Sequence, residues 1–294
     1  MKRFVILIPV FNDWESLSKL LLEIDSSIKD ISKARFDCVI INDASTIKAP
    51  KLSIPRNINS IKIINMKLNK GHARCNAFGI RYLSKLNDYD YVILMDGDGE
   101  DRPVELKLLI QKIFDNPNIS VVAKRIKRSE GIFFKFLYQM HKLLTFIFAG
   151  KNINFGNYSC LTKNDIKILS DKESLWSSFS GSVKKHILNF NTIDSIRGLR
   201  YFGPSKMSLF KLGIHSFSII AVFRKTVFIR SFTVIFISAY LIVKFGMNFY
   251  FLQFLIFHSM FHVLVIALLL FQLLRMVIPL AALLERHNFC LSLR

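Results

Sequence analysis

The first 125 residues alternate short runs of β-branched and aromatic residues with segments of helical periodicity, and this alternation limits the possible folds more than any other feature. Parallel strands need helical crossovers between them, and strands covered on both faces read as nearly continuous apolar runs. The pattern therefore predicts an α/β domain with an open, mostly parallel sheet. Its predicted strands are Phe4–Ile8, Phe36–Ile41, Ile61–Asn65, Tyr91–Met95 and Ser120–Ala123, and its predicted helices are Trp14–Lys29, Gly71–Leu83 and Val104–Phe114.

Polar turns follow three of these strands at the edge where open α/β sheets bind ligands. Ile-Pro-Val-Phe-Asn-Asp (8–13) follows the first strand, Ile-Asn-Asp-Ala-Ser (41–45) follows the second, and Met-Asp-Gly-Asp-Gly-Glu-Asp (95–101) follows the fourth. Because the carboxyl ends of parallel strands meet at one edge, we expect the three turns to converge there.

The third turn is strongly acidic, with Asp96, Asp98, Glu100 and Asp101 within six residues. These carboxylates repel one another unless a cation or ligand compensates them. Mg²⁺ or Mn²⁺ binds through a few carboxylate oxygens and keeps its remaining positions for phosphate oxygens, which suits a diphosphate leaving group. The alternative is an acidic turn that caps the helix beginning near Val104, and it applies best to Asp101.

The C-terminal third predicts membrane spans. Residues 249–274 contain no charged side chain, a run longer than the roughly 20 residues that cross a bilayer. A second candidate span covers 226–243, with Arg230 in its first turn extending toward the interface. The two form a predicted hairpin with basic residues outside both ends, which places the rest of the protein and both termini in the cytoplasm. The alternative is a buried pair of helices without a membrane.

The formal net charge of +20 requires an anionic partner. From Arg200 to the C-terminus the chain has ten Lys or Arg and a single acid, Glu285, so the excess lies beside the predicted spans. Lipid headgroups and phosphate therefore explain the charge better than nucleic acid does. The four cysteines form no CxxC pair, which suits a reducing compartment.

Two further segments mix large apolar residues with basic ones. Residues 132–148 read either as an interfacial amphipathic helix or as a core helix, and 205–225 read as a juxtamembrane helix. The predicted organisation is a catalytic domain at 1–204, a juxtamembrane region at 205–225, and a transmembrane hairpin with a short cytoplasmic tail at 226–294, with the hairpin also a candidate surface for homo-oligomers.

The three turns, in this order and spacing, resemble motifs of the family 2 glycosyltransferases with the GT-A fold, especially the dolichyl- and polyprenyl-phosphate sugar synthases. Ile-Pro-Val-Phe-Asn-Asp is similar to the family's Pro-Thr-Tyr-Asn-Glu, Ile-Asn-Asp-Ala-Ser to its Asp-Asp-Gly-Ser, and Asp-Gly-Asp to its Asp-x-Asp. The resemblance covers roughly 3–211. It implies a nucleotide-sugar donor, a divalent metal and an inverting transfer.

The resemblance also implies roles for particular residues. Asp98 and Glu100 would hold Mg²⁺ or Mn²⁺, and Asp98 is a predicted catalytic residue. The residues that would bind the donor are Pro9, Phe11, Asp13, Asp43, Lys70, Gly71, Asp96, Gly97 and Asp98. Val-Ala-Lys-Arg (122–125) resembles the family's Gly-Ser-Arg segment, which implies that Arg125 reaches a phosphate and assists catalysis.

The acceptor is indicated by Arg-Tyr-Phe-Gly-Pro-Ser-Lys (200–206), which is similar to the Arg-x-x-Gly-x-Ser-Lys of polyprenyl-phosphate transferases. Arg200, Ser205 and Lys206 would bind the acceptor phosphate. Ser159 stands where many synthases have the Arg of a Gly-Phe-Arg motif, which departs from the family. The Gln-x-x-Arg-Trp motif of processive synthases is absent from the sequence, which favours a single transfer.

The leading hypothesis is a transferase of the inner, cytoplasmic membrane that moves one sugar to undecaprenyl or another polyprenyl phosphate for cell-surface glycan assembly. A phosphate monoester is largely anionic at pH 7, so it needs no general base. A second hypothesis is extension of a lipid-linked saccharide at a hydroxyl, with Asp101 as the catalytic base. A third is a membrane scaffold that keeps the fold without activity.

Overall fold

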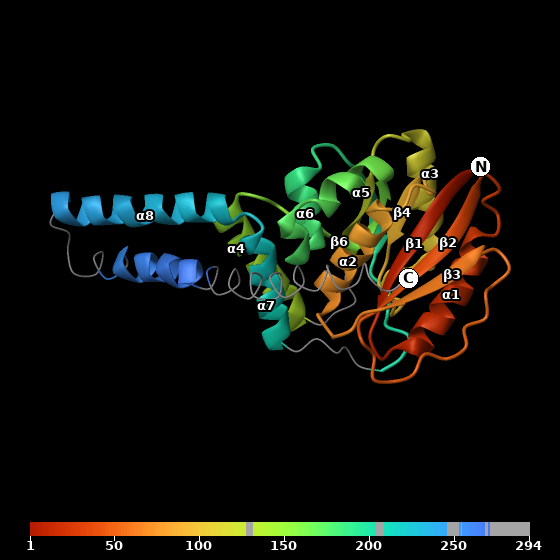
Figure 1. Ribbon diagram of the computed structural model, residues 1–294. Coiled ribbons are helices and arrows are strands. Elements are labelled where there is room, and N and C mark those ends of the chain that lie inside the picture. Colours follow the sequence, from red (N-terminus) through yellow and green to blue (C-terminus); the bar gives the residue numbers. More distant parts are fainter. Residues whose placement is uncertain (128–131, 204–208, 246–252, 254, 268–269, 271–294) are drawn as a thin grey trace, which may run out of the picture. The chain divides into compact units, whose positions relative to one another are not determined.

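The structure, a computed structural model, describes residues 1–127, 132–203, 209–245, 253, 255–267 and 270 (Figure 1). The chain divides into two compact units. The first comprises Met1–Leu137 with Ile153–Ser208, and the second comprises Tyr138–Asn152 with Leu209–Arg294. Residues 138–152, which the sequence analysis placed within the catalytic domain, thus group with the C-terminal segment.

The first unit contains a seven-stranded sheet with the order β3-β2-β1-β4-β6-β5-β7. Its strands are β1 (Lys2–Val10), β2 (Ala34–Asn42), β3 (Ser60–Asn65), β4 (Tyr91–Leu94), β5 (Val121–Lys127), β6 (Phe155–Thr162) and β7 (Asn191–Ile196). β1 pairs in parallel with β2 and β4, whereas β6 runs antiparallel to β4 and β5. Chain order reverses at β1, because β2 lies on one side of it and β4 on the other, and such a switch point is where open sheets bind ligands.

Helices cover both faces of this sheet (Figure 1). The helices α1 and α3 pack on one face, and α2, α5 and α6 pack on the other. Their bounds are α1 (Trp14–Ile28), α2 (His72–Ser84), η1 (Pro103–Glu105), α3 (Leu106–Asp115), α5 (Lys163–Ser170), η2 (Glu173–Trp176) and α6 (Phe179–His186).

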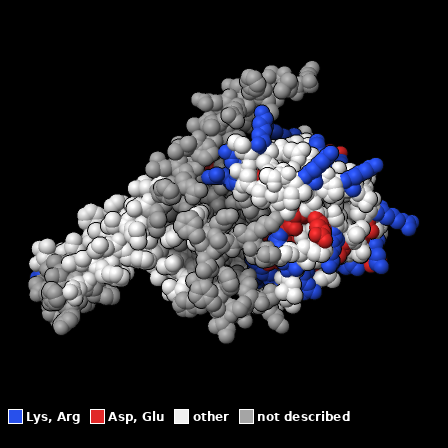
Figure 2. All heavy atoms as spheres, turned by 90° about the horizontal axis from the view of Figure 1, so that it is seen from below, with Lys and Arg blue, Asp and Glu red and all other residues white. Residues whose placement is uncertain are grey.

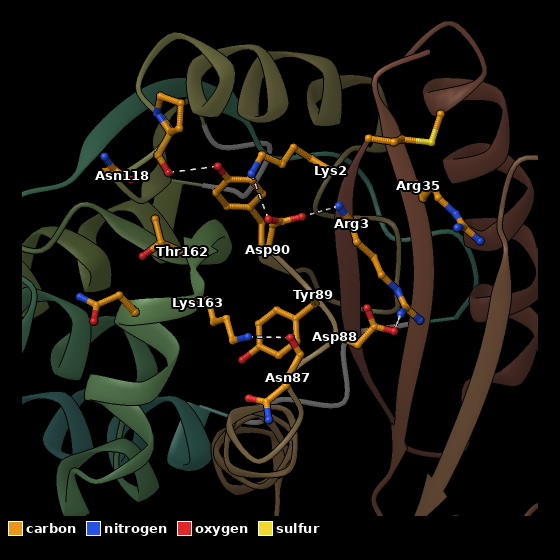
Figure 3. A pocket seen from close by; sticks show the side chains of 14 residues that line it. Lys2, Arg3, Arg35, Asn87, Asp88, Tyr89, Asp90, Asn118, Thr162 and Lys163 are labelled. Carbon is orange, nitrogen blue, oxygen red and sulfur yellow. Dashed lines mark hydrogen bonds and ion pairs between the residues drawn. The ribbon is translucent and has the colours of Figure 1, made fainter.

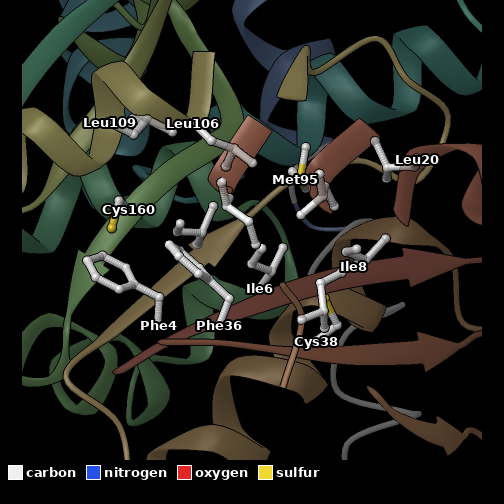
Figure 4. Packing of buried hydrophobic residues seen from close by; sticks show 14 of the residues in the cluster. Phe4, Ile6, Ile8, Leu20, Phe36, Cys38, Met95, Leu106, Leu109 and Cys160 are labelled. Atoms are coloured by element: carbon white, nitrogen blue, oxygen red, sulfur yellow. The ribbon is translucent and has the colours of Figure 1, made fainter. Parts of the chain in front are cut away.

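The main core lies between the sheet and the helices α1 and α3 (Figure 4). Alternate side chains of β1, namely Phe4, Ile6 and Ile8, point into it, and the ring of Phe4 stacks on Phe36 and Tyr91. Burying a side chain of this size contributes roughly 1.5 to 3 kcal/mol. The core therefore fixes the register of the three central strands, and with it the turns at their carboxyl ends.

The second unit contains the helices α4 (Ile132–Ala149, most of which belongs to it), α7 (Leu209–Ala221) and α8 (Arg224–Phe245). Arg230 of α8 donates hydrogen bonds to the carbonyl oxygens of Phe146 and Ile147 at 3.2 and 2.9 Å. Gly150, with φ of 65°, ends α4 beside that guanidinium. The charge of Arg230, expected at a membrane interface, thus satisfies the last carbonyls of a helix, where a cation is favourable.

The prediction of strands and helices for the first 125 residues is confirmed, with boundaries within a few residues. The predicted helix 132–148 corresponds to α4, and the predicted span 226–243 lies within α8. Much of 249–274 lies outside the described residues. Within the part of the chain that the structure describes, no helix has the length and apolar character needed to cross a membrane.

Candidate active site

The end of β1 and the turn after it carry the predicted donor-binding residues Pro9, Phe11 and Asp13. Asp13 precedes α1 as its N-cap residue but makes no side-chain capping bond. Its carboxylate instead pairs with the guanidinium of Arg200. A Cβ on Gly97 would lie 3.0 Å from the carbonyl oxygen of Pro9, so the glycine helps the turn after β4 to approach the end of β1 this closely.

Asp43, directly after β2, has both carboxylate oxygens engaged by backbone. They accept hydrogen bonds from the N–H groups of Lys70 and Gly71, each at 2.8 Å. Gly71, with φ of 85°, is the N-cap residue of α2, so the buried carboxylate of Asp43 fixes the turn from which α2 begins. Burial raises the pKa of Asp43, while the two backbone donors oppose that rise. Its predicted role in binding the donor stays a prediction.

Asp96 is the first carboxylate of the acidic turn and is surrounded by donors. Its Oδ1 lies 3.1 Å from His72 Nε2 and 3.1 Å from Asn157 Nδ2. Burial alone would raise the pKa of Asp96, but the charge and hydrogen bond of His72, together with Arg125 and Asn157, hold it well below its usual range. Asp96 is therefore ionised at neutral pH.

Asp101 closes the same turn, because its Oδ2 accepts the backbone N–H of Asp96 at 2.9 Å. It is 3% exposed, and its Oδ1 lies 3.7 Å from the guanidinium of Arg125. Burial, followed by the charge of Asp96, raises the pKa of Asp101 to about 7, against the opposing effect of Arg125. Arg125, predicted to reach a phosphate, is thus placed beside this buried acid, and Gly156 leaves room for its head.

Asp98 and Glu100, the predicted metal ligands, both pair with arginines from the segment after β7. Asp98 Oδ2 lies 2.9 Å from Arg200 Nη1, and Glu100 pairs with Arg197. Burial and the nearby charges of Asp96 and Glu100 raise the pKa of Asp98 to about 6. A nearby cation stabilises the ionised form of a carboxylate in these surroundings. For Asp98 that cation is the guanidinium group of Arg200.

The carboxylates also supply the hard oxygen donors that Mg²⁺ and Mn²⁺ prefer. Within the described residues no group of three or more His, Cys, Asp or Glu side chains is arranged to hold a metal ion. Mg²⁺ is commonly bound through one or two carboxylates, with water and substrate phosphates completing the octahedron. Asp98 and Glu100 fit a site of that kind.

The structure thus brings the predicted residues together in three sets, and the members of each set are joined by hydrogen bonds or ion pairs. The first is Asp13, Asp98 and Arg200, and the second is Asp96, Asp101 and Arg125. The third is Asp43 with the Lys70–Gly71 turn. Phe11 is exposed, and Ser205 and Lys206 lie outside the described residues.

Sequence reasoning missed three residues that contact carboxylates of the acidic turn: His72, Asn157 and Arg197. Each had a signal nearby, since His72 follows the Asn-Lys-Gly turn, Asn157 is two residues before Ser159, and Arg197 precedes the basic Arg200 segment. Ser159 itself is fully buried on β6, with its hydroxyl bonded to the carbonyl oxygen of Asn157 at 2.8 Å.

Charge is unevenly spread over the surface. In Figure 2 acidic side chains gather in one small area of the face shown, while Lys and Arg are scattered widely over it. A polar hollow of about 820 Å³ lies elsewhere, at the amino ends of β1 and β4, and is lined by Lys2, Arg3, Tyr89, Asp90 and Lys163 (Figure 3). It is at the opposite edge of the sheet from the acidic turn, and its charges pair with one another, as Lys2 does with Asp90.

Comparisons with known proteins identify relatives of this arrangement. The model of the family described as Glycosyl transferase family 2 matches residues 5–177. An uncharacterized protein of Methanocaldococcus jannaschii is 31% identical over 115 residues, 38% of this chain and 47% of that protein. The undecaprenyl-phosphate 4-deoxy-4-formamido-L-arabinose transferase of Salmonella choleraesuis is 26% identical over 166 residues, 55% of this chain and 48% of the transferase. The chain spans about half the length of these curated relatives.

Solved structures share the fold. The mannosyl-3-phosphoglycerate synthase of Rubrobacter xylanophilus has a TM-score of 0.54 at 12% identity, covering 76% of this chain and 73% of the synthase. The glucosyl-3-phosphoglycerate synthase of Mycobacterium tuberculosis, solved with Mn²⁺, uridine diphosphate and phosphoglyceric acid, has a TM-score of 0.53 at 13% identity, covering 77% and 78%. At such identities the likeness concerns the fold.

Proposed function

This chain belongs to glycosyl transferase family 2, and from that premise we propose that it is an inverting glycosyltransferase that moves a sugar from a UDP- or GDP-sugar to undecaprenyl or another polyprenyl phosphate. The observation that carries the proposal is the acidic turn 96–101 at the switch point between β1 and β4, with its carboxylates gathered around Asp98.

The donor would lie along the carboxyl ends of β1, β2 and β4. Pro9, Phe11, Asp13 and the turn that Asp43 holds would line its nucleotide pocket, with Asp96 and Gly97 beside the ribose and diphosphate. Asp98 and Glu100 would hold Mg²⁺ or Mn²⁺, and a bound metal would neutralise the departing diphosphate. The Mn²⁺ in the Mycobacterium tuberculosis synthase supports a divalent ion.

The acceptor phosphate would be bound by Arg200, Ser205 and Lys206. Its oxygen is already anionic at neutral pH, so it attacks the anomeric carbon directly and the configuration inverts in one displacement. The guanidinium of Arg125 lies 3.7 Å from the carboxylate of Asp101, and its charge favours the ionised form of that acid. The name of the Salmonella relative, which acts on undecaprenyl phosphate, supports this class of acceptor.

We place the enzyme at the cytoplasmic face of the inner membrane, with residues 226–243 and 249–274 as a hairpin anchor. The charge-free run 249–274 and the flanking basic residues support this location. Apolar side chains that are exposed on α8, including Phe236 at 71% and Val243 at 86%, also suit a lipid environment. The anchor is a candidate surface for homo-oligomers as well.

A second candidate is extension of a lipid-linked saccharide at a hydroxyl group, for which a general base is needed. The pKa of Asp101, raised to about 7, is in the range of an effective base at neutral pH. Ser159, in place of the family's Arg, also favours this candidate. Against it, Asp101 is buried and bonded to the backbone of the turn.

The deciding experiment incubates the purified protein in detergent with Mg²⁺ or Mn²⁺, undecaprenyl phosphate and a panel of UDP- and GDP-sugars, and follows nucleotide release and lipid product. A metal-dependent glycolipid is expected. Release only with a lipid-linked saccharide would favour the second candidate, and inactivity with both acceptors would support a scaffold without activity.

In the same assay, Asp98→Ala is expected to abolish transfer, a loss of roughly a hundredfold or more, because the metal loses its central carboxylate. Asp30→Asn, at an exposed ion pair with Lys107, is the matched control and should keep full activity. Near-normal turnover of Asp98→Ala would contradict the metal assignment.

A further inference from the structure

The segment Arg197–Phe202, here called the crossing segment, lies directly against the acidic turn. The backbone N–H of Gly198 donates to the carbonyl oxygen of Glu100 at 2.8 Å, and that of Tyr201 donates to the carbonyl oxygen of Asp98 at 3.0 Å. Two backbone bonds therefore hold the crossing segment to the turn independently of side-chain charge.

Arg200 in this segment joins two of the three strand-end turns. One guanidinium nitrogen pairs with Asp13 after β1, and the other donates to Asp98 after β4 at 2.9 Å. The side chains of Arg200 and Asp98 are only 16% and 20% exposed, so solvent screens the pair weakly. Arg200 thus occupies the carboxylate that the proposed function assigns to the metal.

Tyr201 anchors the crossing segment at a distance from those carboxylates. Its ring lies against Gly99, where an added Cβ would come within 2.5 Å of the ring carbons. Its hydroxyl donates to Glu23 of α1, and the ammonium group of Lys19 lies 4.6 Å from the ring centroid. Because Arg200 directly precedes Tyr201 in the chain, these contacts of Tyr201 limit where Arg200 can lie.

We infer that Arg200 and the divalent cation are alternative partners of Asp98, and that the Tyr201–Glu23 contact positions Arg200 on that carboxylate. The inference rests on the proposed metal site. Because Asp98 Oδ1 already accepts the backbone N–H of Glu100 at 3.1 Å, the cation is expected to bind Oδ2 and to displace the guanidinium there, whose planar fork then suits a phosphate group. Binding of the cation is thereby coupled to release of Arg200, and couplings of this kind are typically about 5- to 150-fold.

The test measures Mn²⁺ binding to the full chain in detergent, without donor or acceptor, from the electron paramagnetic resonance signal of free Mn²⁺. Arg200→Gln is expected to bind Mn²⁺ about tenfold more tightly than the wild type. Tyr201→Phe keeps the ring and the charge of the site but removes the bond to Glu23, and it should bind about threefold more tightly. Arg35→Gln, an exposed arginine at the other end of β2, is the matched control and should not change.

Tighter binding by both Arg200→Gln and Tyr201→Phe supports the inference. Tighter binding by Arg200→Gln alone would overturn it, because the loss of a positive charge would then be a sufficient explanation. Equal affinity of Arg200→Gln and the wild type would overturn it and leave the metal site standing. If no protein binds Mn²⁺, even with added UDP or GDP, the inference and the metal part of the proposed function both fail.

Discussion

Asp37, near the amino end of β2, is a buried residue with an ionised side chain. It is 4% exposed and accepts hydrogen bonds from Arg3 Nε at 2.7 Å, from Asn59 Nδ2 at 3.0 Å and from Ser60. Burial alone would raise its pKa, but these donors and the charge of Arg3 lower it below the usual value. The ionised form is therefore the one that the fold stabilises.

Asp37→Asn should lower the free energy of unfolding by roughly 2 kcal/mol at pH 7, since hydrogen bonds to a charged group are lost. Because the folded pKa lies below the unfolded value of about 3.9, the contribution is fully present above that pH and is lost as pH falls through the folded pKa. Urea unfolding between pH 7 and pH 3 measures it. A difference between wild type and Asp37→Asn that stays constant below pH 4 would contradict this assignment.

Asp43 is expected to affect donor binding because its carboxylate fixes the position of the Lys70–Gly71 turn. In Asp43→Asn one oxygen becomes an NH₂ group, which would face the backbone N–H of Lys70 or Gly71, donor against donor. The misplaced turn should raise the KM for the nucleotide-sugar by roughly tenfold, corresponding to about 1.4 kcal/mol. Steady-state kinetics check this, and an unchanged KM would mean that the turn does not line the donor pocket.

The acidic residues of the site were predictable because they follow apolar strands in a short, dense motif. Their partners were not, since Arg197 and Arg200 are about a hundred residues away from Glu100 and Asp98 in the sequence. The local sequence around a basic residue in a turn does not reveal which carboxylate it will pair with. The sequence predicted a metal as the compensating cation, and the described structure supplies arginines.

Among the elements, β1, β2 and β4 were predicted well because both of their faces are covered, which leaves a continuous apolar run. The antiparallel strand β6 was missed, because Phe155–Thr162 mixes Gly, Asn, Ser and Thr with its apolar residues and resembles a loop. Its place between β4 and β5 is decided by long-range pairing, which local periodicity does not encode.

Gly79 sets how closely α2 packs on β1. An added Cβ would lie 2.5 Å from Leu7 Cδ1, so although alanine is the better helix former by about 1 kcal/mol, overpacking by roughly 1 to 3 kcal/mol should win. Gly79→Ala is expected to lower the Tm, and Leu7→Val in the same protein should recover part of the loss. Thermal unfolding of the two variants tests this, and a raised Tm in Gly79→Ala would contradict the close contact.

For the whole molecule, the C-terminal charge pattern predicts firm attachment to membranes. The protein is expected to stay in the membrane pellet after washing with alkaline carbonate or with 1 M salt. At 1 M salt the Debye length is about 3 Å, so attraction to lipid headgroups is screened. Fractionation followed by immunoblotting measures this. Release by salt alone would indicate electrostatic binding at the surface and would contradict the hairpin anchor.

The two units are interleaved along the chain, and this affects how the protein can be divided. Residues 138–152 belong to the second unit although they lie between β5 and β6 of the first, and Arg230 of α8 satisfies the carbonyls at the end of α4. A protein shortened after residue 208 would keep α4 but lose that arginine and the helices grouped with it. A minimal catalytic unit should therefore replace 138–152 with a short linker, so that one excision inside the chain accompanies the cut at its end.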